Sequence, residues 1–221
     1  HYFCTLNEGY SAQTSRRPNI LFIAIDDLRP ELGCYGNQAV HSPNLDLLAL
    51  QGRCFLHAYC QESICSPSRA SLLTGSRPDT IGVVENHAYF RDLNPQIITL
   101  PQHFIAHGYN AAYSGKIFHG RMTDEQHSWN YQPNRKGLKR PTTPGGNARP
   151  ENKRIYAENK SRMVSIYGDS ASRGLIHGPA FEAAQVKDEE YPDGYNTRVA
   201  IQTLDELVQQ DKPWFFGLGF V

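Results

Sequence analysis

The chain has 221 residues, of which 39% are hydrophobic, so it can bury the core of one large domain or two small ones. Lys plus Arg and Asp plus Glu are equal at 22 each, and this balance lacks the basic excess that nucleic-acid binding uses. No apolar run approaches the ~20 residues that a membrane-spanning helix needs. Composition therefore favours a globular protein that binds no nucleic acid and has no membrane span.

The first predicted element is a strand. Residues 1–18 form a polar tail, and the pattern of a folded domain begins at residue 19. Residues 19–25 are a nearly continuous apolar run with several β-branched side chains. Such a run is typical of a strand in a parallel sheet, so we expect it to be covered on both faces.

Helices and strands then alternate along the chain. Capping Ser or Pro residues at the start and Gly at the end predict helices, which we place at residues 43–51, 66–73, 100–107 and 196–209. Short apolar runs predict further strands, which we place at residues 54–59, 109–114 and 214–221. The alternation indicates an α/β fold with a mostly parallel sheet and helices on both faces.

Residues 121–192 interrupt this pattern. Pro, Gly, Asn and charged residues dominate and periodicity is poor, so we expect an irregular, loop-rich stretch or an insertion. Its part between residues 134 and 162 holds nine basic residues against the two acids Glu151 and Glu158. This basic stretch either binds a polyanionic saccharide by charge steering or is a solvated, mobile loop.

Two adjacent carboxylates, Asp26 and Asp27, directly follow the first predicted strand. Ligands of open α/β sheets bind beyond the carboxyl ends of the strands. Neighbouring carboxylates repel each other and need a cation or strong donors, and their hard oxygen atoms suit Ca²⁺ or Mg²⁺. The pair therefore indicates a metal site, with a solvated turn or a helix cap as the alternative.

Cys65 lies just before the predicted helix at residues 66–73, in the positive end of the helix dipole. Arg69 is one helical turn further on and can face back toward Cys65. The pair suggests a reactive thiol beside an oxyanion-binding Arg, with a buried Cys and a surface Arg as the alternative. A hydrolase that used the thiol itself would need a paired His, and the sequence locates none.

The eleven residues Cys65-Ser-Pro-Ser-Arg-Ala-Ser-Leu-Leu-Thr-Gly75 resemble the signature of the type I sulfatases, Cys-x-Pro-x-Arg followed by Leu-Thr-Gly. In that family the Cys is oxidised to formylglycine, whose hydrated aldehyde attacks the sulfur of a sulfate ester. The resemblance implies that Cys65 is the precursor of the catalytic nucleophile, that Arg69 belongs to the active site, and that the fold is alkaline-phosphatase-like. Ser76 departs from the family's usual Gly-Arg-Arg-Pro continuation.

A second resemblance concerns the metal. Residues 25–36 resemble the metal-binding strand end of the iduronate-2-sulfatase branch of this family. The likeness implies that Asp26, Asp27 and the formylglycine made from Cys65 bind Ca²⁺. Family members complete this metal site with residues much later in the chain.

A third segment, Gly115-Lys-Ile-Phe-His119, resembles the Gly-Lys-x-x-His of the same branch. It implies that Lys116 binds the sulfate and that His119 assists at the nucleophile or the leaving group. Residues 191–220 resemble that branch as well, with a Pro-Asp pair, a helix and an aromatic strand.

The resemblance implies hydrolysis of sulfate esters, with the 2-O-sulfate of uronic acid residues in glycosaminoglycans as the expected substrate. A sulfatase for aryl or other carbohydrate sulfates is the alternative, followed by a phosphonate or phosphodiester hydrolase with the same nucleophile. A non-catalytic relative is the remaining alternative, and it would keep Cys65 unmodified.

Residues 19–221 are expected to form the N-terminal part of a catalytic domain. The metal site would be completed by a C-terminal remainder, either in the same chain or as a second chain. Because sulfated glycans occur outside the cytosol, a periplasmic, secreted or lysosomal location is expected.

Overall fold

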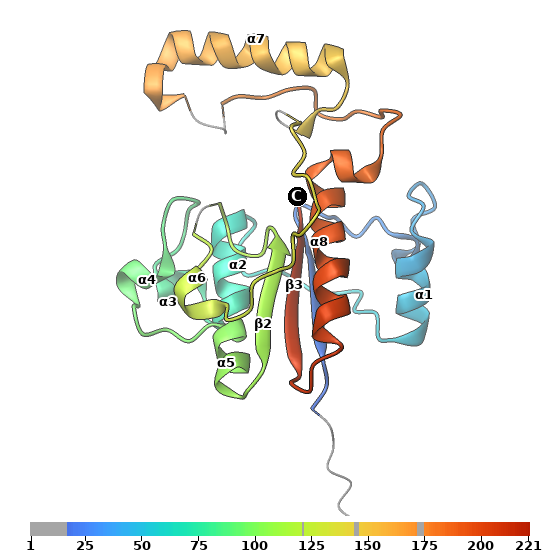
Figure 1. The fold of residues 1–221 in the computed structure, drawn as a ribbon. Coiled ribbons are helices and arrows are strands. Elements are labelled where there is room, and N and C mark those ends of the chain that lie inside the picture. Colours follow the sequence, from blue (N-terminus) through green and yellow to red (C-terminus); the bar gives the residue numbers. More distant parts are fainter. Residues whose placement is uncertain (1–16, 121, 144–145, 172–174) are drawn as a thin grey trace, which may run out of the picture.

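The computed structural model describes residues 17–120, 122–143, 146–171 and 175–221, so the predicted tail at 1–18 lies almost wholly outside the described residues. At its centre is a three-stranded parallel sheet with the order β1-β3-β2 (Figure 1). The strands are β1 (Ile20–Ile25), β2 (Asn110–Gly115) and β3 (Trp214–Phe220). They confirm the strands predicted near these positions.

Helices cover both faces of this sheet, as Figure 1 shows with α2 and α5 on one side and α8 on the other. The central strand β3 is apolar throughout because its side chains alternate between two cores. Phe215 packs in the larger core with Leu73, whereas Phe216 packs in a second core with Leu207. The helices are α2 (Cys65–Thr74), α5 (Leu100–Ala106) and α8 (Pro192–Leu207). The expected α/β fold is confirmed.

Local signals explain where these helices begin and end. Thr99 and Gln102 form a capping box at the start of α5, in which each side chain pairs with the backbone N–H of the other. Gly75 ends α2 with a positive φ of 67°, a conformation that glycine adopts without strain.

The strand predicted at residues 54–59 is wrong. This segment is an exposed loop that includes Cys54, and its large apolar side chains Phe55 and Leu56 are about two-thirds exposed. Its composition suits a strand, but a strand needs a neighbour for its backbone hydrogen bonds. Within the described sheet, the segment pairs with no strand.

The expectation that β1 is covered on both faces is also wrong for the described residues. Leu21, Ile23 and Ile25 on one face of this strand are each between 38% and 45% exposed. Helix α1 (Pro43–Gln51) forms as predicted but has no buried residue, and Leu48 is 60% exposed. An apolar surface thus extends over β1, α1 and the loop at 54–59.

The stretch at 121–192 is only partly irregular. It contains α7 (Pro150–Tyr167), an 18-residue helix with Pro150 in its first turn. Periodicity missed this helix because it buries only Asn152 and therefore has no apolar face. Helix α6 (Glu125–Ser128) and the 3₁₀ turns η3 (Gly168–Ser170) and η4 (Asp188–Glu190) lie in the same stretch.

Three short elements have no counterpart in the predicted set: η1 (Gly33–Tyr35), α3 (Pro78–Ile81) and α4 (Phe90–Leu93). Each is one turn of helix, too short to show a period. Among the helices in the described ranges, none has the length and apolar character needed to cross a membrane.

Candidate active site

The carboxyl ends of the three strands bring two predicted motifs together. Asp26 continues β1 and donates its backbone N–H to Phe220 O at 3.2 Å. Lys116 continues β2 and donates its backbone N–H to Gly219 O at 3.0 Å. The residues that follow β1 and β2 therefore lie on either side of the end of β3, at the edge where α/β proteins bind ligands.

Two glycines allow this close approach of backbones. Gly115 has a φ of 79°, and a Cβ atom there would lie 1.9 Å from Gly219 O. A Cβ atom on Gly219 would lie 1.9 Å from Lys116 O. Any larger residue at either position would push Lys116 away from the strand ends.

The carboxylate of Asp26 is the centre of the site. Arg69 donates to Oδ1 through Nη2 at 2.9 Å and through Nε at 3.3 Å, and Lys116 Nζ pairs with Oδ2. Cys65 Sγ lies 3.6 Å from the same Oδ2. The side chains of Asp26 and Arg69 are only about 10% exposed. The structure thus brings four of the six predicted site residues into direct contact.

These contacts determine the charge state of Asp26. Burial alone would raise its pKa, but the hydrogen bonds and charges of Lys116 and Arg69 outweigh burial and lower the pKa below its usual value. Asp26 is therefore an anion at neutral pH, held between two cations.

Arg69 also ties helix α2 to the segment after β2. Its Nη1 donates to Lys116 O and, at 2.9 Å, to Ile117 O. Every nitrogen of the guanidinium group donates a hydrogen bond to the protein. The oxyanion-binding role that the sequence suggested for Arg69 stays a prediction, whereas its contacts are those of a residue that positions Asp26 and Lys116.

Cys65 is the first residue of α2, so the positive end of the helix dipole faces its side chain. Asn86, from the loop before α4, accepts a hydrogen bond from Ser66 N at 3.0 Å and thereby caps this helix. Sequence reasoning missed Asn86 because the Ile64 position offers no capping side chain and Asn86 is twenty residues away.

His119 lies in the same electrostatic environment. Burial lowers its pKa, and the positive charge of Lys116 lowers it further, so His119 is neutral near pH 7. Its Nδ1 is buried and has no hydrogen-bond partner in the described part of the chain. His87, which the sequence analysis did not single out, also lowers the pKa of His119.

Asp26, Asp27 and Cys65 form a group that could hold a metal, because one ligand atom of each lies within 4.8 Å of the others. Asp27 adopts a φ of 53°, a left-handed conformation that is uncommon for residues other than glycine and often marks functional sites. The two carboxylates suit a hard cation such as Ca²⁺, whereas a thiol is a soft ligand. Oxidation of Cys65 to an oxygen-bearing group would complete an all-oxygen set.

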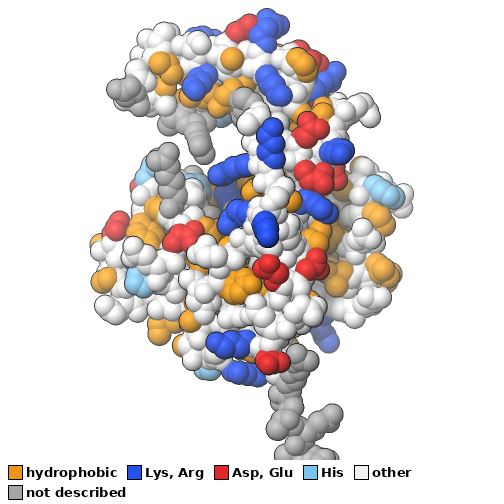
Figure 2. All heavy atoms as spheres, in the orientation of Figure 1, with side chains coloured by type: hydrophobic (Ala, Val, Ile, Leu, Met, Phe, Trp, Pro, Cys, Tyr) orange, Lys and Arg blue, Asp and Glu red, His pale blue; other side chains and the backbone are white. Residues whose placement is uncertain are grey.

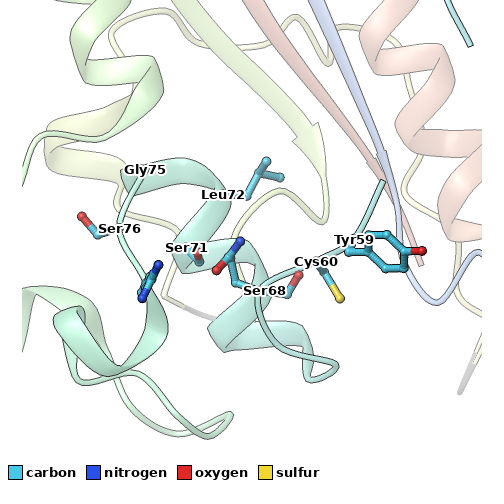
Figure 3. A pocket seen from close by; sticks show the side chains of 9 residues that line it. Tyr59, Cys60, Ser68, Ser71, Leu72, Gly75 and Ser76 are labelled. Carbon is cyan, nitrogen blue, oxygen red and sulfur yellow. The ribbon is translucent and has the colours of Figure 1, made fainter. Parts of the chain in front are cut away.

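A cavity of about 550 Å³ lies against another part of α2 (Figure 3). Ser68, Ser71 and Leu72 of the helix line it together with Tyr59 and Cys60 of the preceding loop. None of the predicted site residues lines this cavity. The candidate site is therefore the open cluster at the strand ends, not this hollow.

The fold and this cluster identify a class of protein. The sequence profile of the Sulfatase family matches residues 18–221, and the chain belongs to that family. Human iduronate 2-sulfatase is 32% identical to it over 222 residues, which cover 97% of the chain and 36% of that relative. The chain thus spans about a third of the length of this curated relative.

Solved structures share the fold. Ps i-CgsB, in its complex with k-i-k-neocarrahexaose, superposes with a TM-score of 0.63 at 22% identity, covering 92% of this chain and 45% of that one. A phosphonate monoester hydrolase of Agrobacterium radiobacter gives a TM-score of 0.57 at 22% identity, covering 93% of this chain and 41% of that one. These likenesses confirm the alkaline-phosphatase-like α/β fold.

Proposed function

We propose that this chain is the N-terminal part of a hydrolase of sulfate esters, with formylglycine made from Cys65 as the nucleophile. The observation that carries the proposal is the contact of Cys65 Sγ with an Asp26 carboxylate that Arg69 and Lys116 also contact. A sulfate ester carries negative charge on its oxygens, and its hydrolysis needs a positioned nucleophile among cations. Membership of the Sulfatase family supports the same reaction.

The residues have separate roles in this proposal. Arg69 holds Asp26 and the backbone after β2 in place. Lys116 Nζ pairs with Asp26 Oδ2, and in this proposal it would contact the sulfate if Asp26 held a metal. His119 is neutral at pH 7, and its Nδ1, which has no hydrogen-bond partner among the described residues, can accept or donate a proton beside the leaving group.

Asp26, Asp27 and the oxygen of an oxidised residue 65 would hold Ca²⁺ in this proposal. The bound ion would supply positive charge for the sulfate oxygens. With one atom from each, the three ligands leave at least half of the six to eight coordination positions of Ca²⁺ open, so further ligands must come from elsewhere.

We propose that the C-terminal remainder of the protein, in the same chain or a second one, provides those ligands. The exposed apolar surface over β1, α1 and the loop at 54–59 supports this, because such a surface needs a protein partner. Family members work on sulfated substrates, so a periplasmic, secreted or lysosomal location follows as part of the proposal.

For the substrate, we propose a 2-O-sulfated uronic acid of a glycosaminoglycan. The similarity to iduronate 2-sulfatase supports this choice. Specificity for an aryl or another carbohydrate sulfate is the alternative, and initial rates with a panel of sulfated disaccharides and aryl sulfates would separate them.

Mass spectrometry of the peptide that contains Cys65, from protein made in its natural host, tests the nucleophile. Replacement of the CH₂SH group by an aldehyde lowers the mass by roughly 18 Da. An unmodified thiol would instead point to an unmatured or non-catalytic relative. Inactivation by iodoacetamide would contradict the proposal, because a formylglycine enzyme has no thiol at this position to alkylate.

A further inference from the structure

A second cavity, of about 560 Å³, lies between α7, α8 and the loop at residues 137–143. Five cationic side chains line it, against the two carboxylates of Glu189 and Glu190. The cations are Lys139, Arg140, Lys153, Lys187 and Arg198. Figure 2 shows Lys and Arg side chains gathered at the hollow between α7 and the rest of the molecule.

The tertiary structure concentrates these charges. Lys139, Arg140 and Lys153 belong to the basic stretch, whereas Lys187, directly before η4, and Arg198 of α8 lie beyond it. Within the described part of the chain, Arg198 alone among the five has an ion-pair partner, with its Nε 3.5 Å from Glu189 Oε1. The other four cations of the cavity take part in no ion pair within the described residues, so their charge is available to an anion.

Hydrogen bonds to α8 hold the wall of the cavity in place. Asn134 N donates to Thr203 Oγ1 at 2.9 Å, and Gln202 Nε2 donates to Lys136 O at 3.0 Å. Both bonds attach the start of the basic stretch to α8. Thr143 also lines the cavity, and its Oγ1 is buried without a hydrogen-bond partner among the described residues.

The cavity faces the same end of the sheet as the candidate active site. Helix α8 begins beside the carboxyl end of β3, where Val221 N donates to Asp193 Oδ2 at 3.1 Å. Asp26 pairs with Phe220 at that same strand end. Tyr195 and Arg198, in the first two turns of α8, therefore place the cavity near this end of the sheet.

We propose that this cavity is a second anion subsite, which binds a sulfate or carboxylate of a neighbouring sugar in a sulfated oligosaccharide. The inference rests on the proposed sulfatase function and names the substrate class as an extended, polyanionic saccharide. A small aryl sulfate carries no second anion and makes no use of the cavity. The neutral net charge of the chain argues against a general polyanion-binding surface.

The test compares two variants of the full-length protein that lose the same charge. The cavity variant carries Lys139→Gln, Arg140→Gln, Lys153→Gln and Lys187→Gln. The control variant carries Arg135→Gln, Lys136→Gln, Lys160→Gln and Arg162→Gln, which lie in the same loop and helix but do not line the cavity. Thermal unfolding of both variants checks that they fold like the parent.

The substrates are a heparin tetrasaccharide and 4-nitrophenyl sulfate, whose only anionic group is the sulfate. In the cavity variant, KM for the tetrasaccharide should rise about tenfold, as expected from the loss of four exposed charge contacts. KM for the aryl sulfate should stay within about twofold in both variants. An equal rise in the control variant, or no rise in the cavity variant, overturns the inference.

Binding of the tetrasaccharide measured by calorimetry separates this inference from the proposed function. If the parent releases sulfate from neither substrate, the sulfatase proposal fails, and the dissociation constants of the two variants still decide the subsite. A tenfold weaker binding in the cavity variant alone supports it. Displacement of the tetrasaccharide by a DNA oligonucleotide of equal charge would assign the cavity to nucleic acid and overturn it.

Discussion

At Asp26, one carboxylate accepts hydrogen bonds from two cations while a thiol lies against it. The group is nearly buried, so each partner affects its position and its charge. Arg69 does most to fix the position of the Asp26 carboxylate relative to the segment after β2, because its planar guanidinium group contacts both Asp26 and the backbone at Ile117.

Replacement of Arg69 by Lys tests this positioning role. Lys keeps the charge but cannot form the fork, so we expect kcat/KM for an aryl sulfate to fall about 100-fold, the cost of a misplacement near 1 Å. Calcium affinity should fall as well, which a purely electrostatic role would not require. Arg77→Lys, at the exposed residue just before α3, is the control and should leave both values unchanged.

A second buried ion pair holds the segment that follows His119. Arg91 contacts Asp124 through Nε and Nη2, and Tyr89 and Ser128 donate to the same carboxylate. Burial would raise the pKa of Asp124, but these partners lower it below its usual value. The proximity of Asp124 also helps burial to raise the pKa of Tyr89 to about 12.

The Asp124→Asn variant should be destabilised by about 3 kcal/mol, because Arg91 would remain buried without its anion. Since the folded pKa of Asp124 is lowered, its contribution is present above the unfolded value and is lost as pH falls through the folded value. In urea unfolding from pH 6 to pH 2, the free energy of unfolding should therefore fall less with pH in the variant than in the parent.

The exposed pair of Arg149 and Glu151 provides the control for this prediction. Both side chains are about half exposed, so Glu151→Gln should change the free energy of unfolding by less than about 0.5 kcal/mol. Equal changes in the free energy of unfolding at Asp124 and Glu151 would show that the buried ion pair stabilises the protein no more than the exposed one.

At the scale of elements, the meeting of β2 and β3 places Lys116. The backbones approach so closely that Gly115 and Gly219 leave no room for a side chain. This explains why the Gly-Lys pair of the motif includes a glycine. Gly115 lets the ends of β2 and β3 approach each other, and the next residue, Lys116, then pairs with Asp26.

Gly115→Ala should therefore destabilise the protein by more than the roughly 1 kcal/mol that a left-handed conformation costs an L-residue. Gly146→Ala is a matched control, since Gly146 has a φ of 78° but no atom of the described residues lies within 4 Å of its added Cβ. Thermal unfolding of both variants isolates the backbone clash. A melting temperature lowered equally in both would mean that the strand ends can separate without cost.

At the scale of the whole molecule, the described elements leave the apolar face of β1 beside α1 uncovered. Ile23 on β1 is 43% exposed, and α1 buries no residue. Figure 1 shows α1 set apart from the helices that pack on the sheet. We expect the C-terminal remainder to cover this face in the complete protein.

Ile23→Glu tests that expectation in the full-length protein. A charge buried in a covered apolar face should lower the free energy of unfolding by on the order of 3 kcal/mol, measured by chemical unfolding. Val164→Glu on α7, where the parent residue is similarly 45% exposed, should cost less than about 0.5 kcal/mol. If the full-length protein tolerates both changes equally, the β1 face remains open to solvent.

Periodicity and capping residues alone located β1, α2, α5, β2, α8 and β3, because each combines an apolar run with a Ser, Pro or Gly at its boundary. Asp26, Asp27, Cys65 and Arg69 were singled out from their residue types and from their places beside predicted elements. Lys116 and His119 were singled out only by the resemblance of their segment to a sulfatase motif, and the roles of all six residues stay predictions.

Only the tertiary structure decided the rest. The 54–59 segment has the composition of a strand but finds no partner, and α7 is a helix without an apolar face, so neither state could be deduced from local pattern. Likewise, Asn86 caps α2 and Lys187 joins the basic cavity from distant positions in the chain. Contacts between distant segments depend on how elements pack, and a linear pattern carries no record of that packing.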